Sequence, residues 1–361
     1  GKNRLYGDAG DDIITSNGEG DVVDAGEGNN TIIIGGDTHG GEFFSGDGDD
    51  VYQLNTGIHS EYNQPLRIES GGGNDVIDID SHIDMSWSDF LLGEGNDTIN
   101  VTSALDYALY IDGQGGDDNI NILAGSRSSS NSVDGGDGND KIVLEGDFEN
   151  ESNQRFHGGN GDDIIDASNA VGLSGLKNYL SGGSGDDLIE GGSTDELIHG
   201  EDDHDVLIGG GGNDVIYGFN NNGSKGDNGS IDIAVFSGES TDYKVYRATD
   251  VDYGYVYYIQ DTRDDSPDGL DTLYDIDRLR FSDGESIDIE IYYNEKAGEG
   301  AIGETLIGTE GDDLINGFGG NDTITGSGGD DFLIGGDGDD VIDGGTGKNR
   351  LYGDAGDDII T

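Results

Sequence analysis

The sequence predicts an all-β protein: a parallel β-roll and β-solenoid of short stacked strands, plus a small antiparallel β-rich module. Three observations indicate this fold. Glycine-rich nonapeptides follow one another without a break from Gly308. Aspartates followed by a large apolar residue recur every 21 to 25 residues between Asp50 and Asp187. The tyrosine-rich stretch from Ser230 to Ile289 instead alternates polar and apolar residues, which is typical of antiparallel strands buried on one side.

The six nonapeptides from Gly308 share the pattern G-G-x-G-x-D-x-U-x, in which U is a large aliphatic residue. Glycines allow the sharp turn with positive φ that the first half of each repeat needs. The turn carbonyls and the aspartate at position 6 supply hard oxygen ligands, which suit Ca²⁺ better than a softer metal. These repeats resemble the RTX (haemolysin-type) family. The resemblance implies that two nonapeptides form one turn of a parallel β-roll, with many Ca²⁺ ions held between stacked turns.

The predicted calcium ligands are the position-6 side chains and the carbonyls of the glycine turns. The side chains are Asp12, Asn30, Asp50, Asp75, Asp97, Asp118, Asp140, Asp163, Asp187, Asp205, Asp214, Asp313, Asp322, Asp331, Asp340, Asn349 and Asp358. The carbonyls are those of residues such as Gly159, Gly161, Gly183, Gly185, Gly210, Gly212, Gly336 and Gly338. Asn30 and Asn349 lack the charge of aspartate but keep an oxygen. Position-5 residues such as Asp162 are expected to point outward without a role.

Two columns of apolar residues accompany the widely spaced aspartates. Two residues after each aspartate stand Tyr52, Ile77, Ile99, Ile120, Ile142, Ile165 and Ile189. Seven residues before each stand Phe43, Ile68, Phe90, Ile111, Val133, Phe156 and Leu180. Because both columns hold while the segments between them vary in length, the pattern predicts a solenoid with one coil per roughly 22 residues.

These patterns divide the chain into five segments. Residues 1–33 are predicted to form a β-roll that continues the C-terminal roll of a preceding unit, and residues 34–181 a solenoid with a calcium ladder on one side. Residues 182–229 are a roll and linker, residues 230–302 a β-rich module and linker, and residues 303–361 a further roll. Residues 231–289 resemble a module that accompanies RTX repeats, with its AVFSG opening, SPDG turn and DxLRFxDG close.

The chain has 78 acidic and 16 basic residues, a formal net charge of −62, and no cysteine. This charge excludes nucleic acid and anionic membrane surfaces as partners, and it predicts that the chain needs cations to fold. No apolar run approaches the roughly 18 residues of a membrane-spanning helix, so no membrane insertion is expected.

We expect no enzyme. His199 and His204 frame the sequence HGEDDH, but their spacing does not match the H-E-x-x-H motif, which also requires a helix. Both are expected to be surface residues. No G-x-S-x-G nucleophile elbow is present.

The first fifteen residues, GKNRLYGDAGDDIIT, are identical to the last fifteen, Gly347 to Thr361. This predicts one unit of a tandem array with a period of 346 residues, whose partners are further copies of itself. The expected function is a calcium-rigidified extracellular fibre, adhesin stalk or surface layer of a bacterial protein, and the RTX resemblance implies type I secretion. The alternatives are a folding and secretion module of an RTX enzyme or toxin, or an array that binds cell-surface glycans or matrix protein.

Overall fold

The computed structural model is almost entirely β and forms two compact units. The described residues are 2–35, 38–55, 58–60, 65–80, 84–85, 88–102, 109–123, 131–148, 154–173, 179–219, 230–250, 254–264, 266–289, 303, 305–308, 314–329 and 331–361. The first unit comprises Gly1–Ser237 and Pro267–Asp271, and the second comprises Gly238–Ser266 and Thr272–Thr361.

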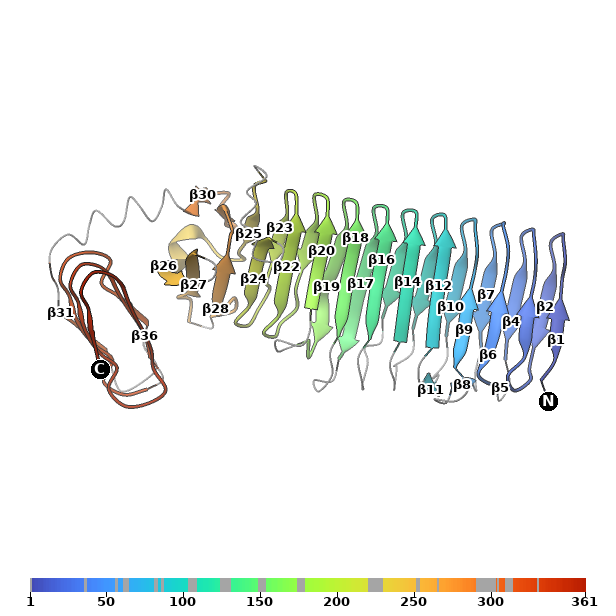
Figure 1. Cartoon of the computed structure of the whole chain (residues 1–361), viewed down its shortest axis with the longest axis horizontal. Coiled ribbons are helices and arrows are strands. Elements are labelled where there is room, and N and C mark those ends of the chain that lie inside the picture. The colour runs from blue at the N-terminus through green and yellow to red at the C-terminus, as the bar shows by residue number, and fades with distance from the viewer. Residues whose placement is uncertain are drawn as a thin grey trace. The chain divides into compact units, whose positions relative to one another are not determined.

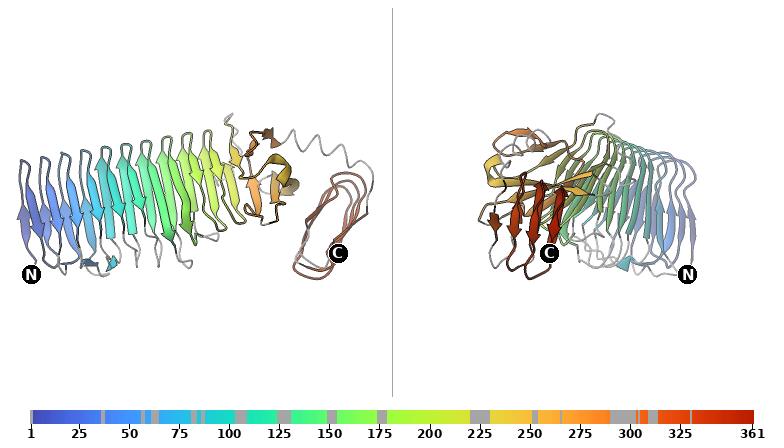
Figure 2. Two further views of the ribbon diagram at one scale, coloured as in Figure 1. Left: turned by 180° about the vertical axis from the view of Figure 1, so that it is seen from behind. Right: turned by 60° about the vertical axis from the view of Figure 1, so that its left-hand side comes forward.

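The first unit is a parallel solenoid in which successive strands alternate between two sheets (Figure 1). One sheet contains β1 (Arg4–Tyr6), β3 (Val22–Asp24), β6 (Gly41–Phe44), β9 (Leu66–Glu69), β12 (Ser88–Glu94), β14 (Leu109–Gly115), β16 (Ser132–Asp137), β18 (Arg155–Asn160), β20 (Tyr179–Ser184), β22 (Leu197–Asp202) and β24 (Val215–Phe219). The same stacking is visible from behind in Figure 2.

The other long sheet contains β2 (Ile13–Ser16), β4 (Thr31–Ile34), β7 (Val51–Leu54), β10 (Val76–Ile79), β13 (Thr98–Val101), β15 (Asn119–Ile122), β17 (Lys141–Asp147), β19 (Ile164–Val171), β21 (Leu188–Glu190), β23 (Val206–Ile208) and β25 (Ile233–Val235). A short third sheet joins β5 (Thr38–His39), β8 (Ile58–Ser60) and β11 (Asp84–Met85). The same two long sheets therefore run through the segments 1–33, 34–181 and 182–229.

The two predicted apolar columns form the core between these sheets. Every residue of both columns is at most 2% exposed. The parallel register places Ile77 beside Tyr52 on one side and Ile99 on the other, and it places Phe90 beside Ile68 and Ile111. The prediction of a parallel solenoid is confirmed, because identical positions of successive coils stack on one another.

Glycine is required where the turns of successive coils approach most closely. Gly159 and Gly183 both have positive φ, 125° and 126°, and occupy the same position in adjacent turns. A Cβ at Gly183 would collide with the carbonyl oxygen of Gly159. Only glycine combines this backbone conformation with this approach, so the turns can stack at the spacing of the strands.

The second unit contains the antiparallel strands predicted from the tyrosine-rich stretch. β26 (Tyr243–Asp250) follows a single 3₁₀ turn, η1 (Ser240–Asp242), and pairs antiparallel with β27 (Gly254–Asp261). β29 (Arg278–Arg280) pairs antiparallel with β30 (Ser286–Asp288). β28 (Leu270–Tyr274) begins in the first unit and ends in the second. Val256, Tyr257 and Tyr258 are at most 5% exposed, so this part of the hairpin offers no exposed aromatic platform.

The second unit also contains a roll built from the C-terminal nonapeptides. Its two parallel sheets consist of β31 (Thr305–Ile307), β33 (Thr323–Thr325), β35 (Val341–Asp343) and β37 (Ile359–Ile360), and of β32 (Leu314–Asn316), β34 (Phe332–Asp337) and β36 (Arg350–Ala355). Ile324, Leu333 and Ile342 form its core. They occupy position 8 of their nonapeptides, where the motif predicts an inward aliphatic residue.

Candidate metal sites in the turns

The position-6 side chains form a continuous inner ladder along one edge of the first unit. The backbone N–H of each position-6 residue donates a hydrogen bond to Oδ1 of the position-6 residue in the next coil. The bonds are 2.6–3.1 Å long and run through Asp12, Asn30, Asp50, Asp75, Asp97, Asp118, Asp140, Asp163, Asp187 and Asp205. One oxygen of each carboxylate from Asp50 to Asp205 is therefore used to join neighbouring coils.

The second oxygen of these carboxylates has a different environment. It is buried and accepts no hydrogen bond in Asp12, Asp50, Asp75, Asp97, Asp118, Asp140, Asp163, Asp187, Asp205, Asp214 and Asp340. A buried charged oxygen without a partner costs several kcal/mol, on the order of 3 to 5. So many copies in one register indicate a ligand that the protein itself does not supply.

A main-chain oxygen from position 1 of the following turn lies on the same side as this second carboxylate oxygen. A Cβ built at Gly135 would meet both Oδ2 of Asp140 and the carbonyl oxygen of Gly158. The same pair of oxygens flanks Gly113, where Oδ2 of Asp118 and the carbonyl of Gly135 converge. A cation bound between two such acceptors would neutralise both of them. The sequence named carbonyls of positions 2 and 4 as examples, and the structure adds those of position 1 as candidates.

The two asparagines at position 6 reveal what the second oxygen faces. Oδ1 of Asn30 accepts the N–H of Asp12, which fixes its amide nitrogen on the other side. That nitrogen donates to the carbonyls of Gly26 and Gly28, at 3.1 and 2.7 Å. In the second unit, Nδ2 of Asn349 likewise donates to the carbonyl of Gly344, at 2.6 Å.

Asn30 and Asn349 were predicted to supply a metal-binding oxygen, and these contacts show how that oxygen is used in the structure. Their oxygen is occupied by the backbone, and the atom that faces the turn is a hydrogen-bond donor. In these two turns the side-chain amide lies where a cation would be needed beside aspartate. The carbonyls that it reaches are thereby identified as acceptors directed at the site.

The comparison with protein families identifies this architecture. The model of the RTX calcium-binding nonapeptide repeat matches residues 1–32, 127–147, 150–169, 175–207, 190–222, 300–333 and 334–361, together about half of the chain. The chain belongs to the RTX calcium-binding nonapeptide repeat family. It is a calcium-binding repeat protein.

The other comparisons add little to this assignment. Among solved structures, the crystal structure of the extracellular lipase LipA from Serratia marcescens matches at 18% sequence identity and a TM-score of 0.18. The match covers 53% of this chain and 33% of the lipase chain, so the chain spans about a third of that protein. At this TM-score the likeness says nothing about shared activity. No curated protein matches the chain.

The RTX turns fit Ca²⁺ by the chemistry of their donors. Within the described ranges, no group of three or more acidic or histidine side chains is arranged to hold a metal on its own. An ion would therefore combine one or two carboxylate oxygens with backbone carbonyls, an all-oxygen set that Ca²⁺ accepts at high coordination number. When bound, the ion supplies positive charge to oxygens that otherwise repel one another.

Burial perturbs the carboxylates of the ladder in the direction expected of sites that need neutralising. Desolvation raises the pKa of Asp118 and of Asp163 to about 8, and that of Asp205 to about 9. The adjacent carboxylates add to the shift, and the backbone N–H that each accepts opposes it. Without a cation, these groups hold protons at neutral pH.

The remaining predicted ligands lie in the same kind of turn. Asp214 continues the ladder of the opposite edge, and its Oδ1 accepts the N–H of Glu196 at 2.8 Å. In the second unit, the N–H of Asp322 donates to Asp340, and that of Asp340 donates to Asp358. Asp331 is buried, and its backbone N–H donates to Oδ1 of Asn349. Asp313 lies outside the described residues.

An outer ladder at position 5 corrects the expectation that these residues have no role. Oδ1 of Asp162 accepts the N–H of Asp186 in the next coil, at 3.0 Å, and the N–H of Asp162 donates to Asn139 at 2.9 Å. The same bond, 2.8–3.2 Å long, links Asp11, Asn29, Asp49, Asn74, Asn96, Asp117, Asn139, Asp162, Asp186 and His204. Because the side chain here accepts the N–H of the following coil, position 5 favours a short side chain with a hydrogen-bond acceptor.

In two degenerate turns, protein groups donate hydrogen bonds to both oxygens of the carboxylate. Asp21, at position 6 of its repeat, accepts the N–H of Asn3 on Oδ1 and the hydroxyl of Ser16 on Oδ2. Glu196 accepts the hydroxyl of Thr194 and the N–H of Gly192. Serine or threonine thus supplies the hydrogen that replaces an ion.

The two histidines of HGEDDH have separate structural roles. His199 is 1% exposed and lies between the rings of Tyr179 and Tyr217, at 4.6 and 4.5 Å. The expectation that it is a surface residue is therefore wrong, and burial lowers its pKa to about 4. His204 is exposed, and its Nδ1 accepts the N–H of Ile231 at 2.6 Å. It replaces the Asp or Asn oxygen of the outer ladder.

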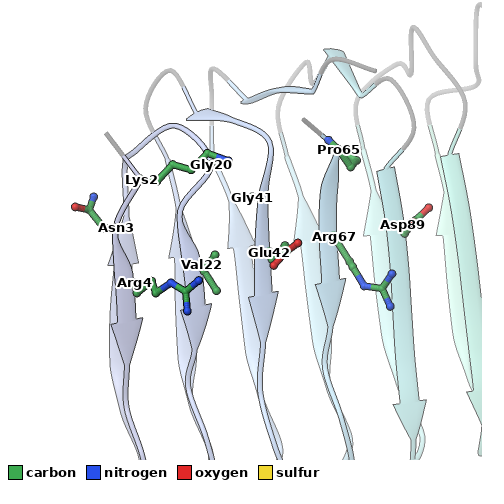
Figure 3. Close-up of a pocket in the computed structure, with 10 residues that line it drawn as sticks. All are labelled: Lys2, Asn3, Arg4, Gly20, Val22, Gly41, Glu42, Pro65, Arg67 and Asp89. Atoms are coloured by element: carbon green, nitrogen blue, oxygen red, sulfur yellow. The ribbon is translucent and has the colours of Figure 1, made fainter. Parts of the chain in front are cut away.

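Figure 3 shows an open groove across the first strands of the first unit. Its lining contains Lys2, Arg4 and Arg67 together with Glu42 and Asp89. The strand register places Arg67 between Glu42 and Asp89. Acidic and basic side chains thus alternate along the groove, so the groove offers a ligand no surface of uniform charge.

No helix among the described residues is long and apolar enough to cross a bilayer.

Proposed function

We propose that this chain is a structural repeat of a large secreted bacterial protein, in which calcium rigidifies an extracellular fibre, adhesin stalk or surface layer. The observation that carries the proposal is the identity of residues 1–15 and 347–361. Fifteen identical residues at a period of 346 are expected of a tandem array, whereas an enzyme needs its calcium roll only once. The proposal gives this chain no catalytic role.

The pairing of the two identical segments supports a continuous array. In the N-terminal copy, Arg4 and Leu5 pair with Val22 and Val23, which follow in sequence. In the C-terminal copy, Arg350 and Leu351 pair with Phe332 and Leu333, which precede. The same residues use opposite strand edges in the two copies. A repeat in the middle of an array can therefore make both sets of pairs at once.

The inner ladder would continue across the same segment in joined units. Oδ1 of Asp358 accepts the N–H of Asp340, whereas the N–H of Asp12 donates to Asn30. Asp358 and Asp12 are the same residue of the repeat, and these two bonds use different atoms of it. Joined units would thus share one ladder without a break, and with it one row of calcium sites.

Secretion is consistent with the chemistry of the chain. At a net charge of −62, the metal-free chain repels itself and stays open. Low cytosolic calcium would keep it unfolded during type I export, and the high calcium outside the cell would fold it. The same charge leaves nucleic acid and anionic lipid as unsuitable partners, and further copies of the unit as suitable ones.

The experiment uses a chain of two units, in which residues 16–361 are repeated after Thr361. In Ca²⁺, electron microscopy should show the two units in one fixed relation, and circular dichroism should show β structure that is lost in calcium-free buffer. Free hinging at the junction would overturn the fibre, and full β signal without calcium would overturn the dependence on the ion. A catalytic domain encoded beside a single copy of the unit would favour the alternative of an RTX enzyme or toxin.

A further inference from the structure

We propose that the chain builds one more calcium site, at the end of the opposite edge, between the turn Gly209–Asp214 and the distant segment Pro267–Asp271. The inference rests on the proposed role of calcium in the regular turns. Pro267–Asp271 lies outside every stretch that matches the RTX repeat. The structure nevertheless includes it in the first unit.

The segment makes the same two ladder bonds as a regular turn. The N–H of Asp214 donates to Oδ1 of Asp271 at 2.8 Å, which is the inner-ladder bond. The N–H of Leu270 donates to Oδ1 of Asn213 at 2.9 Å, which is the outer-ladder bond. In both cases the partners are 57 residues apart in sequence. The segment Pro267–Asp271 therefore provides the turn that stacks on Gly209–Asp214 at this edge.

The backbone of the segment also stacks like a regular turn. Gly269 has a φ of +71°, and a Cβ there would collide with the carbonyl oxygen of Gly212. The carbonyl oxygen of Pro267 lies against Gly211. Residues 266–274, SPDGLDTLY, thus form a nonapeptide that keeps only part of the repeat motif. It has glycine at position 4, aspartate at position 6 and the buried Leu273 at position 8.

The side chains of the two stacked turns lack a positive charge. Asp214 is fully buried, and its Oδ2 accepts no hydrogen bond. A Cβ at Gly209 would meet that oxygen, so it faces the interior of the turn as in the regular sites. Asp271 is 2% exposed. Two buried carboxylates in adjacent turns require neutralisation, and carboxylate and carbonyl oxygens favour Ca²⁺.

The other edge ends in a similar way. The N–H of Asp205 donates to Oδ1 of Asp232 at 3.1 Å, and His204 accepts the N–H of Ile231. Ile231 and Asp232 precede the antiparallel hairpin in sequence, and Pro267–Asp271 follows it. Both ends of the inserted hairpin segment are therefore joined to the ladders. Calcium at the Asp214–Asp271 site would stabilise the packing of Pro267–Asp271 on the turn Gly209–Asp214.

The test compares Asp271→Asn with Asp264→Asn in the full chain. Asparagine keeps an oxygen for the N–H of Asp214 but removes the charge, as in the turn of Asn30. Asp264 is exposed and lies three residues before Pro267, so its variant makes the same change of charge outside the turn. Native mass spectrometry counts the bound Ca²⁺, and hydrogen exchange follows the amide of Leu270.

We expect Asp271→Asn to bind one Ca²⁺ fewer than the parent chain and to exchange the Leu270 amide faster, and Asp264→Asn to match the parent in both. An unchanged ion count in Asp271→Asn would overturn the site. Loss of several ions together would also overturn it, because Asp271 would then act by supporting the fold. A parent chain that binds no calcium would instead be a failure of the proposed function.

Discussion

Asp140 and Asp163 occupy the same position in adjacent coils, and the N–H of Asp140 donates to Oδ1 of Asp163 over 2.7 Å. Oδ2 of Asp163 is buried beside Gly158 and accepts no hydrogen bond. One carboxylate thus has two tasks: one oxygen joins the coils and the other is left for a cation. This division explains why the ladder needs aspartate and not merely negative charge.

Asp163→Ala should remove both contributions. The N–H of Asp140 would lose its acceptor in a buried site, which costs about 1 to 3 kcal/mol, and one calcium ligand would be lost as well. We expect a lower thermal midpoint in Ca²⁺ and reduced cooperativity of calcium binding, measured by calorimetry. Asp163→Asn should retain the hydrogen bond and lose the ion. Equal midpoints for these two variants would contradict the division between the two oxygens.

Asp162→Ala should have a smaller effect. It removes the bond from the N–H of Asp186, but water can reach this exposed position, so we expect a loss of about 0.5 kcal/mol. Calcium stoichiometry should not change. Asp162→Asn should match the parent protein, because Asn139 makes the same bond in the preceding coil. Chemical denaturation in Ca²⁺ measures all three proteins. A loss in Asp162→Asn as large as that in Asp162→Ala would show that charge, and not the bond, acts at position 5.

Asn30→Asp should create a calcium site. The variant replaces an amide that donates to Gly26 and Gly28 with a second oxygen directed at the same carbonyls. We expect one additional Ca²⁺ per chain by native mass spectrometry. Without calcium, the variant should be less stable than the parent, since two hydrogen bonds are exchanged for a buried charge.

Asn349→Asp offers the matched test in the second unit, where one amide bond to Gly344 is replaced. Should both variants bind the same number of ions as the parent, the interpretation of the two asparagine turns is wrong.

The stability of the calcium-free fold should decrease as pH rises. Burial raises the pKa of Asp118 and of Asp163 from 3.8 to about 8. Between these values the unfolded chain has released protons that the folded chain keeps, so the fold is favoured at the low end of the range and penalised at the high end. With saturating Ca²⁺ the slope should reverse, because protons compete with the ion for the same oxygens.

Circular dichroism of calcium-free protein at pH 4.5 and pH 8 checks this prediction, with the calcium-loaded protein as the control. More β structure in the calcium-free protein at pH 8 than at pH 4.5 would contradict it.

The repeating pattern of the sequence was enough to predict the architecture. Columns such as Ile77, Ile99 and Ile120 hold at each coil, and an inward residue that recurs at a fixed place in every coil can only stack on its copies. The position-6 residues could be found for the same reason. Periodicity reports which residues are equivalent, and in a solenoid equivalent residues are neighbours.

The sequence by itself therefore determined the fold class, the ladder of aspartates and the kind of ion. Only the tertiary structure decided which atoms act. It assigned the oxygen of Asn30 to the backbone, gave Asp162 a bond across coils, and buried His199 between two rings. It also brought Asp271 onto the ladder beside Asp214. Each of these four findings depends on contacts between coils or between distant segments. The residue type at one position does not determine which of its atoms faces the neighbouring coil.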